Sequence, residues 1–287
     1  MNFKRILAAV VVCSAALICP DRSHAQQPPA SAQPAPPAPE RDPDQNLDAL
    51  QPDFTISTLP TTLRLPRFKG AFRVTHRFGR PLGQGSFGSL ASDFFSLDSS
   101  AQIGLEYRFG LMRGTQAAIY RTNDRTIEFF VERDVMQQSA SRPIGLSAIA
   151  AMDGTNNFRD SYSPALGVVV SRKVGRFAAL YAQPIWVNNS NPLPAEIIDR
   201  NDSFLLGLSG RFRIRRTAYV IVEGAPRVAG YNPGAEHVAV GLEKLVGGHV
   251  FQINVSNGVG TTIGQIARGG SSKNWYLGFN ISRKFWR

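Results

Sequence analysis

Residues 68–78 alternate between apolar and polar side chains with a period of two, and this pattern restricts the fold of the chain more than any other feature. Phe72 and its even-numbered neighbours are mostly aromatic or apolar, whereas cations recur at Lys69, Arg73 and Arg77. Successive side chains of a β-strand point to opposite faces, so this segment predicts a strand with one apolar and one cationic face. Helical stripes are hard to find in the residues that follow. The sequence therefore predicts an all-β protein.

The same alternation recurs along the chain in segments of about ten residues, the strand length of a membrane barrel. These segments lie near 101–109, 115–121, 126–136, 143–153, 163–173, 177–187, 203–213, 217–225, 236–245, 249–257 and 274–285. With the first segment they predict twelve strands, within a range of ten to fourteen. Ten residues that rise about 3.3 Å each and tilt by about 45° span roughly 23 Å, close to the apolar band of a transmembrane β-barrel.

The connections between these segments differ in length in a regular way. Most odd-numbered connections are long or moderate and every even-numbered one is short; the exception, Thr122–Arg125, contains an Asn-Asp pair typical of a hairpin turn. In a barrel with an even number of strands, both termini lie at the same end. Short turns are expected at that end and long loops at the opposite end. A Greek-key sandwich does not predict this asymmetry. We therefore expect an antiparallel up-and-down transmembrane β-barrel.

The N-terminal region has the features of an exported protein. Lys4 and Arg5 precede an apolar run, Ile6–Cys19, and Ser23-His24-Ala25 offers small residues for cleavage, so residues 1–25 are expected to be a signal peptide. Residues 26–53 are rich in Pro, Ala and Gln and predict a disordered periplasmic linker. Residues 54–287 then form the barrel domain. The expected location is the bacterial outer membrane.

Cysteine and charge content narrow the function classes. Both cysteines, Cys13 and Cys19, fall in the predicted signal peptide, which excludes disulfides and thiolate metal sites from the mature chain. Residues 54–287 hold 28 basic and 15 acidic side chains, a net charge of +13. Nucleic acid is not expected as a partner, because the cations are scattered singly along alternating segments of an exported chain.

Several motifs resemble those of a bacterial family of β-barrel proteins of uncharacterised function. The resemblance covers about residues 66–285 and is carried by Thr75–Gly79 (THRFG), Phe95–Asp98 (FSLD), Gly104–Tyr107 (GLEY), Gly247–Gln252 (GGHVFQ), Asn257-Gly258 and Gly278–Phe285 (GFNISRKF). It implies an outer-membrane barrel and brings no substrate, catalytic residue or ligand. Such barrels are recognised by the assembly machinery through a terminal aromatic of the last strand, here Phe285 or Trp286.

No enzymatic site, cofactor or metal is expected. An outer-membrane phospholipase places a serine two residues after a histidine on one strand face, whereas His76, His237 and His249 are followed at that spacing by Phe or Ala. Three histidines on separate strands do not predict a metal site either. Gly83–Gly88 matches a nucleotide-binding pattern, but it lies in a long loop without a strand–helix unit, where glycines form turns.

Charged side chains on the polar faces are the candidate functional residues. A charge on the lipid face of a barrel costs about 2–4 kcal/mol at the midplane, so these side chains are expected to face the lumen. They are Lys69, Arg73, Arg77, Glu106, Arg108, Glu128, Glu132, Arg211, Arg213 and Lys284. Aromatic side chains are expected at the lipid face and its interfaces, at Phe72, Phe78, Trp275, Phe279, Phe285 and Trp286.

Two interpretations of these charges remain open. An excess of cations lining a narrow, water-filled lumen predicts a passive pore or binder for small anionic solutes, which we take as the expected function. Cations and carboxylates that pair across strands predict instead a filled lumen, and a structural or assembly barrel without transport. An outer-membrane hydrolase is the third interpretation. The expected partners are outer-membrane lipid, the barrel-assembly machinery and small anionic solutes.

Overall fold

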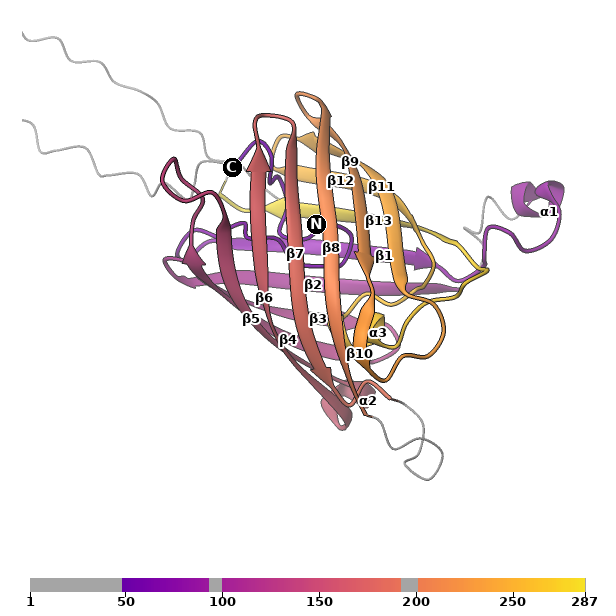
Figure 1. Cartoon of the computed structure of the whole chain (residues 1–287). Helices are drawn as coiled ribbons and strands as arrows, with labels where there is room; N and C mark the ends of the chain where they lie inside the picture. Colours follow the sequence, from indigo (N-terminus) through magenta and orange to yellow (C-terminus); the bar gives the residue numbers. More distant parts are fainter. Residues whose placement is uncertain (1–47, 93–99, 192–200, 287) are drawn as a thin grey trace, which may run out of the picture. The chain divides into compact units, whose positions relative to one another are not determined.

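The computed structural model describes residues 48–92, 100–191 and 201–286 and shows a closed antiparallel β-barrel with one additional short strand (Figure 1). The strands are β1 (Gly70–Phe78), β2 (Ala101–Met112), β3 (Thr115–Thr122), β4 (Ile127–Met136), β5 (Gly145–Gly154), β6 (Asp160–Val174), β7 (Ala178–Asn188), β8 (Asp202–Arg215), β9 (Ala218–Ala225), β10 (Arg227–Gly230), β11 (His237–Val246), β12 (His249–Ser256) and β13 (Tyr276–Lys284). The predicted all-β fold and the twelve barrel strands are confirmed.

Each barrel strand pairs with its neighbours along the chain, and the first strand closes the barrel on the last. β1 pairs with β13 in a register that places Val74 opposite Ile281. The additional strand β10 follows β9 after a single residue, Pro226, and pairs with β8 as β9 does. Proline has no backbone N–H to donate, but the Pro226 carbonyl still accepts a hydrogen bond from the Leu206 amide, 2.8 Å away. The path of β9 therefore continues into β10 with a break that the alternation did not predict.

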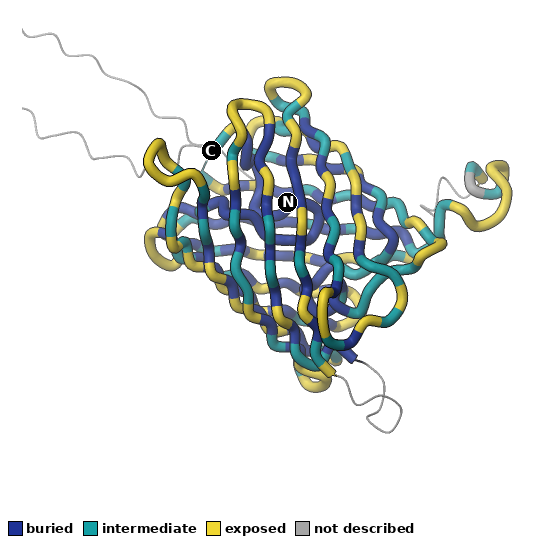
Figure 2. Tube along the Cα trace, viewed as in Figure 1, coloured by how far each residue is buried: buried dark blue, intermediate teal, exposed yellow. Residues whose placement is uncertain are grey.

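The two faces of the wall differ as the alternation predicts. On β2, the side chains of Ile103, Leu105 and Tyr107 are between 38% and 49% exposed, whereas those of Glu106 and Arg108, on the opposite face, are buried. The same alternation of exposed and buried residues runs along neighbouring strands (Figure 2). The apolar side chains thus face outward and the polar ones inward, the arrangement of a barrel that spans lipid.

The two ends of the barrel are named here by their connections. The turn end carries the short connections 113–114, 137–144, 175–177, 216–217 and 247–248, and the loop end carries those after β1, β3, β5, β7, β10 and β12. Short helices lie in three loop-end connections: α1 (Phe87–Ser92), α2 (Thr155–Phe158) and α3 (Ile263–Ala267). Among the described residues, no helix is long and apolar enough to cross a bilayer.

Residues 48–66 lie inside the barrel, ahead of β1, and are called the plug below. Leu50, Ile56, Leu59 and Leu65 of the plug are at most 6% exposed. Residues 48–53 were expected to belong to the disordered linker, so the barrel unit begins earlier in the chain than residue 54. The remainder of the predicted linker, like the predicted signal peptide, lies outside the described residues.

The aromatic residues expected at the lipid face divide into three groups. Trp275 and Phe285 are exposed, and Phe72 and Phe279 are partly buried. Phe78 is only 5% exposed, because its ring packs beside those of His76 and Phe279. Trp286 differs most from expectation, since its ring packs edge-on against Phe54 of the plug at 6.4 Å. The exposed aromatic at the end of β13 is therefore Phe285.

Candidate functional site: a plugged lumen

The plug is a hairpin stabilised by its own backbone. Thr55 and Pro60 form a bridge, the Ile56 amide donates to the Leu59 carbonyl at 2.9 Å, and the Thr61 amide donates to the Phe54 carbonyl at 2.9 Å. Ser57 and Thr58 form the tip. A hairpin of this kind leaves outward-facing amides and carbonyls that need partners once it is buried.

Glu223 of β9 satisfies the amides at the tip of the plug. Its carboxylate accepts hydrogen bonds from the backbone nitrogens of Ser57 (2.9 Å), Thr58 (3.0 Å) and Leu59 (2.9 Å). His237 of β11 lies on the other side of the same carboxylate, with its Nε2 3.1 Å from Oε1. The Glu223 side chain has no solvent exposure. Backbone amides around a carboxylate stabilise its charge, so one wall residue holds the whole turn.

Other wall side chains hold the carbonyls of the plug. They come from six strands, and each reaches a main-chain oxygen instead of a plug side chain. These hydrogen bonds are Arg211 to Thr55 (2.8 Å), Gln252 to Ile56 (2.7 Å), Asn280 to Ser57 (2.9 Å), Gln183 to Pro60 (3.1 Å), Gln116 to Leu63 (3.0 Å), Tyr219 to Ala49 (2.7 Å) and Lys284 to Pro52. The lumen therefore binds an extended main chain from many directions.

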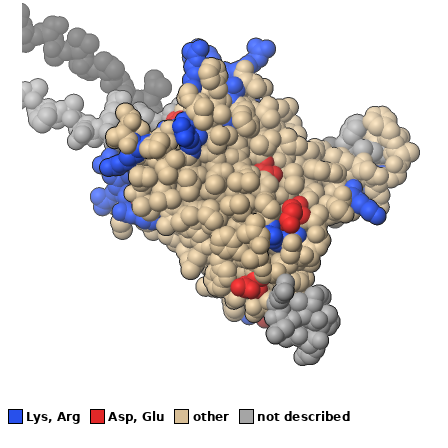
Figure 3. Space-filling view, viewed as in Figure 1, with Lys and Arg blue, Asp and Glu red and all other residues tan. Residues whose placement is uncertain are grey.

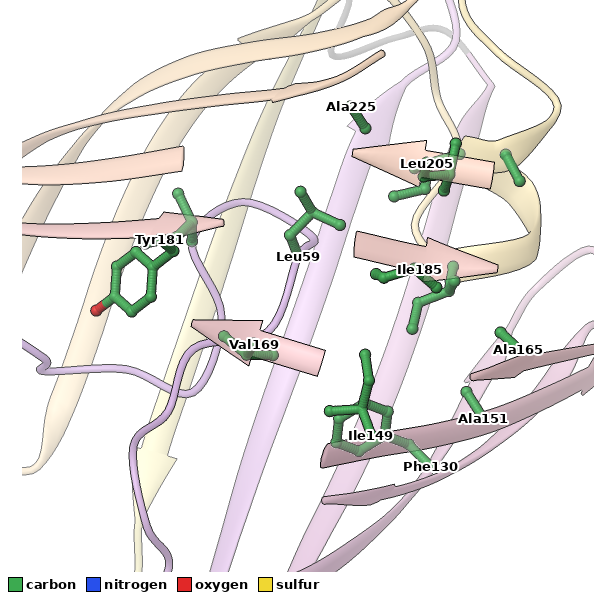
Figure 4. Packing of buried hydrophobic residues seen from close by; sticks show 14 of the residues in the cluster. Leu59, Phe130, Ile149, Ala151, Ala165, Val169, Tyr181, Ile185, Leu205 and Ala225 are labelled. Atoms are coloured by element: carbon green, nitrogen blue, oxygen red, sulfur yellow. The ribbon is translucent and has the colours of Figure 1, made fainter. Parts of the chain in front are cut away.

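Apolar packing completes the fit of the plug. Ile56 and Leu59 belong to one buried cluster with Val169, Ile185 and Leu205 of the wall; Figure 4 shows Leu59 directed into this cluster. Leu59 also lies against Gly207 of β8, where an added Cβ would come within 2.8 Å of its methyl group. Burial of side chains of this size contributes about 1.5–3 kcal/mol each. The plug is thus held by both its backbone and its side chains.

Four of the predicted lumen residues form a continuous ion-pair network. Arg73 lies 3.2 Å from Glu106, which is 2.8 Å from Arg108, and Arg108 lies 3.6 Å from Glu132. The Arg108 guanidinium also sits over the ring of Phe130 at 4.8 Å. The network joins the strands β1, β2 and β4, so its charges neutralise one another inside the wall.

The other predicted residues are divided between the interior and the turn end. Arg211 pairs with Glu243 at 2.9 Å, and both side chains have no exposure. Arg77 donates to Asn280 and to the Ser57 hydroxyl of the plug. Lys284 is buried beneath the plug, whereas Lys69 and Arg213 are partly exposed near the turn end.

Glu128 lies near the loop end of the lumen, where α3 fills the interior. The amide of Ile263 donates to the Glu128 carboxylate at 2.8 Å, and the hydroxyl of Thr262 donates to Asp153 at 2.6 Å. Thr262 and Gln265 also form a capping box, which satisfies amides at the start of the helix. The β12–β13 connection therefore folds into the barrel mouth.

Little free volume remains beside the lumen charges. A cavity lined by Thr55, Arg73, Glu106, Tyr120 and Ile263, among others, has about 20 Å³, room for roughly one water molecule. A polar cavity of about 160 Å³ lies at the turn end, next to Asp48, Gln51 and Lys173. The first of these is too small for a solute.

The expected excess of cations is not found inside the wall. The buried cations of the described strands are Arg73, Arg77, Arg108, Arg211, Arg227 and Lys284, and the buried carboxylates are Glu106, Glu128, Glu132, Asp153, Glu223 and Glu243. Sequence parity predicted that ten charges face the lumen, and eight of them are buried in the structure. The prediction did not include Glu223, which binds the tip of the plug, or Glu243, which binds Arg211. It also missed the plug, whose uncharged run Thr55–Leu63 was the available signal.

The three histidines weighed for hydrolysis have different surroundings. His76 stacks on Phe279 at 4.9 Å on the outer face, His249 lies 2.9 Å from Arg283, and His237 binds Glu223. Within the described part of the chain, no group of three His, Cys, Asp or Glu side chains has the spacing to hold a metal ion.

Comparison with known proteins places the chain among membrane barrels. Among solved structures, it is similar to the KdgM porin in complex with oligogalacturonate (TM-score 0.47, 9% identity, 76% of this chain and 99% of that chain covered), to an outer-membrane channel from Pseudomonas putida F1 (0.48, 12%, 77% and 97%) and to the outer membrane phospholipase A from Escherichia coli (0.41, 11%, 77% and 91%). Similarities of this size carry no information on activity.

At the level of sequence, no curated protein matches the chain. A family model described as a membrane bound beta barrel domain (DUF5777) matches residues 54–285, nearly the span over which the motifs resemble a barrel family. The chain belongs to this DUF5777 family of membrane-bound β-barrels.

Proposed function

We propose that the protein is an outer-membrane barrel that its own N-terminal hairpin keeps closed, so that it does not conduct small solutes in this state. The observation that carries the proposal is the plug itself, which wall side chains from six strands hold by its main chain. Charge balance in the wall supports it, because paired cations and carboxylates form a filled interior and not an anion-selective one.

The orientation and export route form part of the same proposal. The predicted signal peptide 1–25 directs export, and the plug begins at the turn end, where Asp48 pairs with Lys173 at 2.7 Å. We assign the turn end, where β13 also ends, to the periplasm. The exposed Phe285 is the expected contact of the barrel-assembly machinery, and lipid covers the apolar outer face.

Conductance of a locked plug tests the proposal. The Oγ atoms of Thr62 and Ser171 lie 2.6 Å apart, one on the plug and one on β6, so T62C/S171C can form a disulfide in a mature chain without other cysteines. We expect wild type and oxidised T62C/S171C to show no current in planar bilayers. Both preparations are first shown to be folded by their heat-dependent gel migration. Equal, steady currents from both would show an open lumen despite the plug.

A second function is a pore for small anionic solutes that opens when the plug leaves. It is favoured by Arg77 and Lys284, whose hydrogen bonds to Ser57 and Pro52 of the plug would be lost on withdrawal. We expect the E223Q substitution, made in the T62C/S171C variant, to raise the open probability under reducing conditions. Oxidation of the same protein, which forms the disulfide, should abolish the current. Charge reversal at Arg73 or Arg211 should then shift the reversal potential in a salt gradient. Silence under all conditions would leave the closed barrel as the function.

A further inference from the structure

The net positive charge of the chain is concentrated outside the lumen, around the turn end. Ten cations at this end are exposed, and they are called the collar below: Arg67, Arg113, Arg133, Arg142, Arg172, Arg176, Arg215, Arg216, Lys244 and Arg283. Figure 3 shows Lys and Arg gathered where the β6–β7 and β8–β9 turns lie, with acidic side chains further toward the other end. The charge excess of the sequence is therefore a surface feature.

Carboxylates of the described residues do not neutralise the collar. Asp48 and Asp134, which lie at the same end, already pair with Lys173 and Arg64. Among the described residues, none of the ten collar cations forms an ion pair with a carboxylate. The loop end is different, since the exposed Asp124 and Asp160 lie there among its cations.

Collar cations alternate with the outermost apolar side chains of the barrel. Ile214, 60% exposed, precedes Arg215, and Phe177, 63% exposed, has the Arg176 guanidinium 5.5 Å from its ring centre. Arg67 lies in the same way over Phe68, at 4.3 Å. These apolar side chains mark where the lipid-facing surface ends. The cations next to them are therefore at the level of lipid headgroups.

We propose that the collar binds the phosphate groups of anionic phospholipids in the leaflet at the turn end. Guanidinium groups bind phosphate oxygens in a bidentate manner, and arginine makes up nine of the ten collar residues. Collar residues lie just before β1, in or next to the β2–β3, β4–β5, β6–β7 and β8–β9 turns, and near the ends of β11 and β13, so the collar surrounds the barrel. Lipid surrounds a barrel in the same way, whereas a protein or polymer would contact one side.

Lipid retention tests this assignment. The protein is folded into vesicles of equal phosphatidylcholine and phosphatidylglycerol, extracted in mild detergent, and its co-purifying lipid is quantified by mass spectrometry. We expect phosphatidylglycerol to be enriched at least about fivefold over phosphatidylcholine, the effect of a single cation near an anionic surface. The enrichment should fall with salt, since exposed charges are screened.

A matched pair of variants separates the collar from general charge. R172Q/R176Q/R215Q/R216Q removes four collar cations, and R121Q/R125Q/R159Q/K273Q removes four exposed cations at the loop end. The first should lose the enrichment and the second should keep it. If four changes prevent folding, as judged by gel migration, R172Q/R176Q and R215Q/R216Q are measured separately.

Two results would overturn the proposal. One is equal enrichment in wild type and collar variants. The other is unchanged lipid enrichment together with collar-dependent sedimentation on isolated peptidoglycan, which would assign the collar to a polymer. Neither result affects the proposed closed lumen, because the plug makes none of the collar contacts and conductance is measured independently.

Discussion

The carboxylate of Glu223 lies 2.9 Å from the backbone nitrogen of Leu59, although 164 residues separate them in sequence. The contact joins β9 to the tip of the plug and is repeated at the two preceding amides. Because Glu223 binds the main chain of the plug, a substitution of the Ser57 or Thr58 side chain keeps these donors, whereas a substitution of Glu223 removes their shared acceptor.

Replacement of Glu223 by Gln should weaken the binding of the plug to the wall but leave the plug inside the barrel. The amide keeps the shape of the side chain but has one acceptor oxygen and no charge. Hydrogen bonds to charged groups contribute about 1.5–3 kcal/mol, so the free energy of unfolding in urea should fall by roughly that amount. Hydrogen exchange at Ser57–Leu59 should accelerate more than exchange in the strands. Glu236→Gln, which alters a carboxylate bound to Arg227 and not to the plug, serves as the control; equal effects of both would contradict the assignment.

Arg211→Met should be more damaging, because it leaves the buried Glu243 carboxylate without a cation, with only the Gln252 amide among the described residues as a hydrogen-bond donor at 3.3 Å. Removing one partner of a buried ion pair costs about 3–5 kcal/mol, and the variant also loses a donor to the Thr55 carbonyl. The double variant R211M/E243L should recover much of the loss, since apolar replacement of both partners is often neutral. Urea unfolding of the single and double variants in vesicles measures the coupling. A double variant as unstable as the sum of the single variants would show that the two residues act independently.

Gly207→Val should displace the plug from its packing site on β8. An added Cβ at this position would lie 2.8 Å from a methyl group of Leu59 and from Oε1 of Gln183. Overpacking of this kind costs about 1–3 kcal/mol. Maleimide labelling of a single T62C reporter should therefore be faster than in the parent. Gly224→Val is the matched control, because a Cβ there would have only the His237 carbonyl nearby, at 3.8 Å; unchanged labelling in Gly207→Val would place Leu59 elsewhere.

Asp124 should make the seating of α3 depend on pH. Burial raises the pKa of this carboxyl, but hydrogen bonds from Thr122 and from the Thr126 amide outweigh it and hold the pKa below its ordinary value of 3.8. Its carboxylate accepts from Gln265 of α3 at 3.0 Å. A lowered folded-state pKa gives stability that is complete above the ordinary value and is lost as pH falls through the lowered one.

Proteolysis of the β12–β13 connection measures this effect. Wild type should be better protected than D124N at about pH 6, and the difference should vanish as pH falls through the lowered pKa of Asp124 and the carboxylate gains its proton. A difference that stays constant over this range would show that charge at Asp124 does not hold α3.

Much of the wall could be predicted from sequence because its cause is local. Alternation depends only on which face each residue occupies, so Arg73, Glu106 and Arg211 could be placed inside by parity alone. The pairing of Arg211 with Glu243 could not, since it depends on which strands are neighbours and on their register. Knowing that charges face inward does not reveal whether they balance.

The plug could not be predicted for a different reason. Residues around Gln51 and Asp53 have the polar composition of a solvated segment. Composition alone does not distinguish a chain whose polar groups bind water from one whose polar groups bind the side chains of a barrel wall. Many of its hydrogen-bond partners lie more than a hundred residues away in sequence, Gln183 and Glu223 for example. Only the run of uncharged residues from Thr55 to Leu63 set this segment apart from the linker.

The barrel closes where its first strand meets its last, and the plug contacts both. Thr55 binds Arg73 of β1, while Asp53 accepts from Ser282 of β13 at 2.6 Å and Ser57 accepts from Asn280. The hairpin is therefore a splint across the closing seam, and the β1–β13 junction is the place where loss of the plug would weaken the wall. In a chain made from its N-terminus, the splint exists before the seam does. We therefore expect the plug to promote closure of the barrel, and disulfide trapping across β1 and β13, with and without the hairpin, measures this effect.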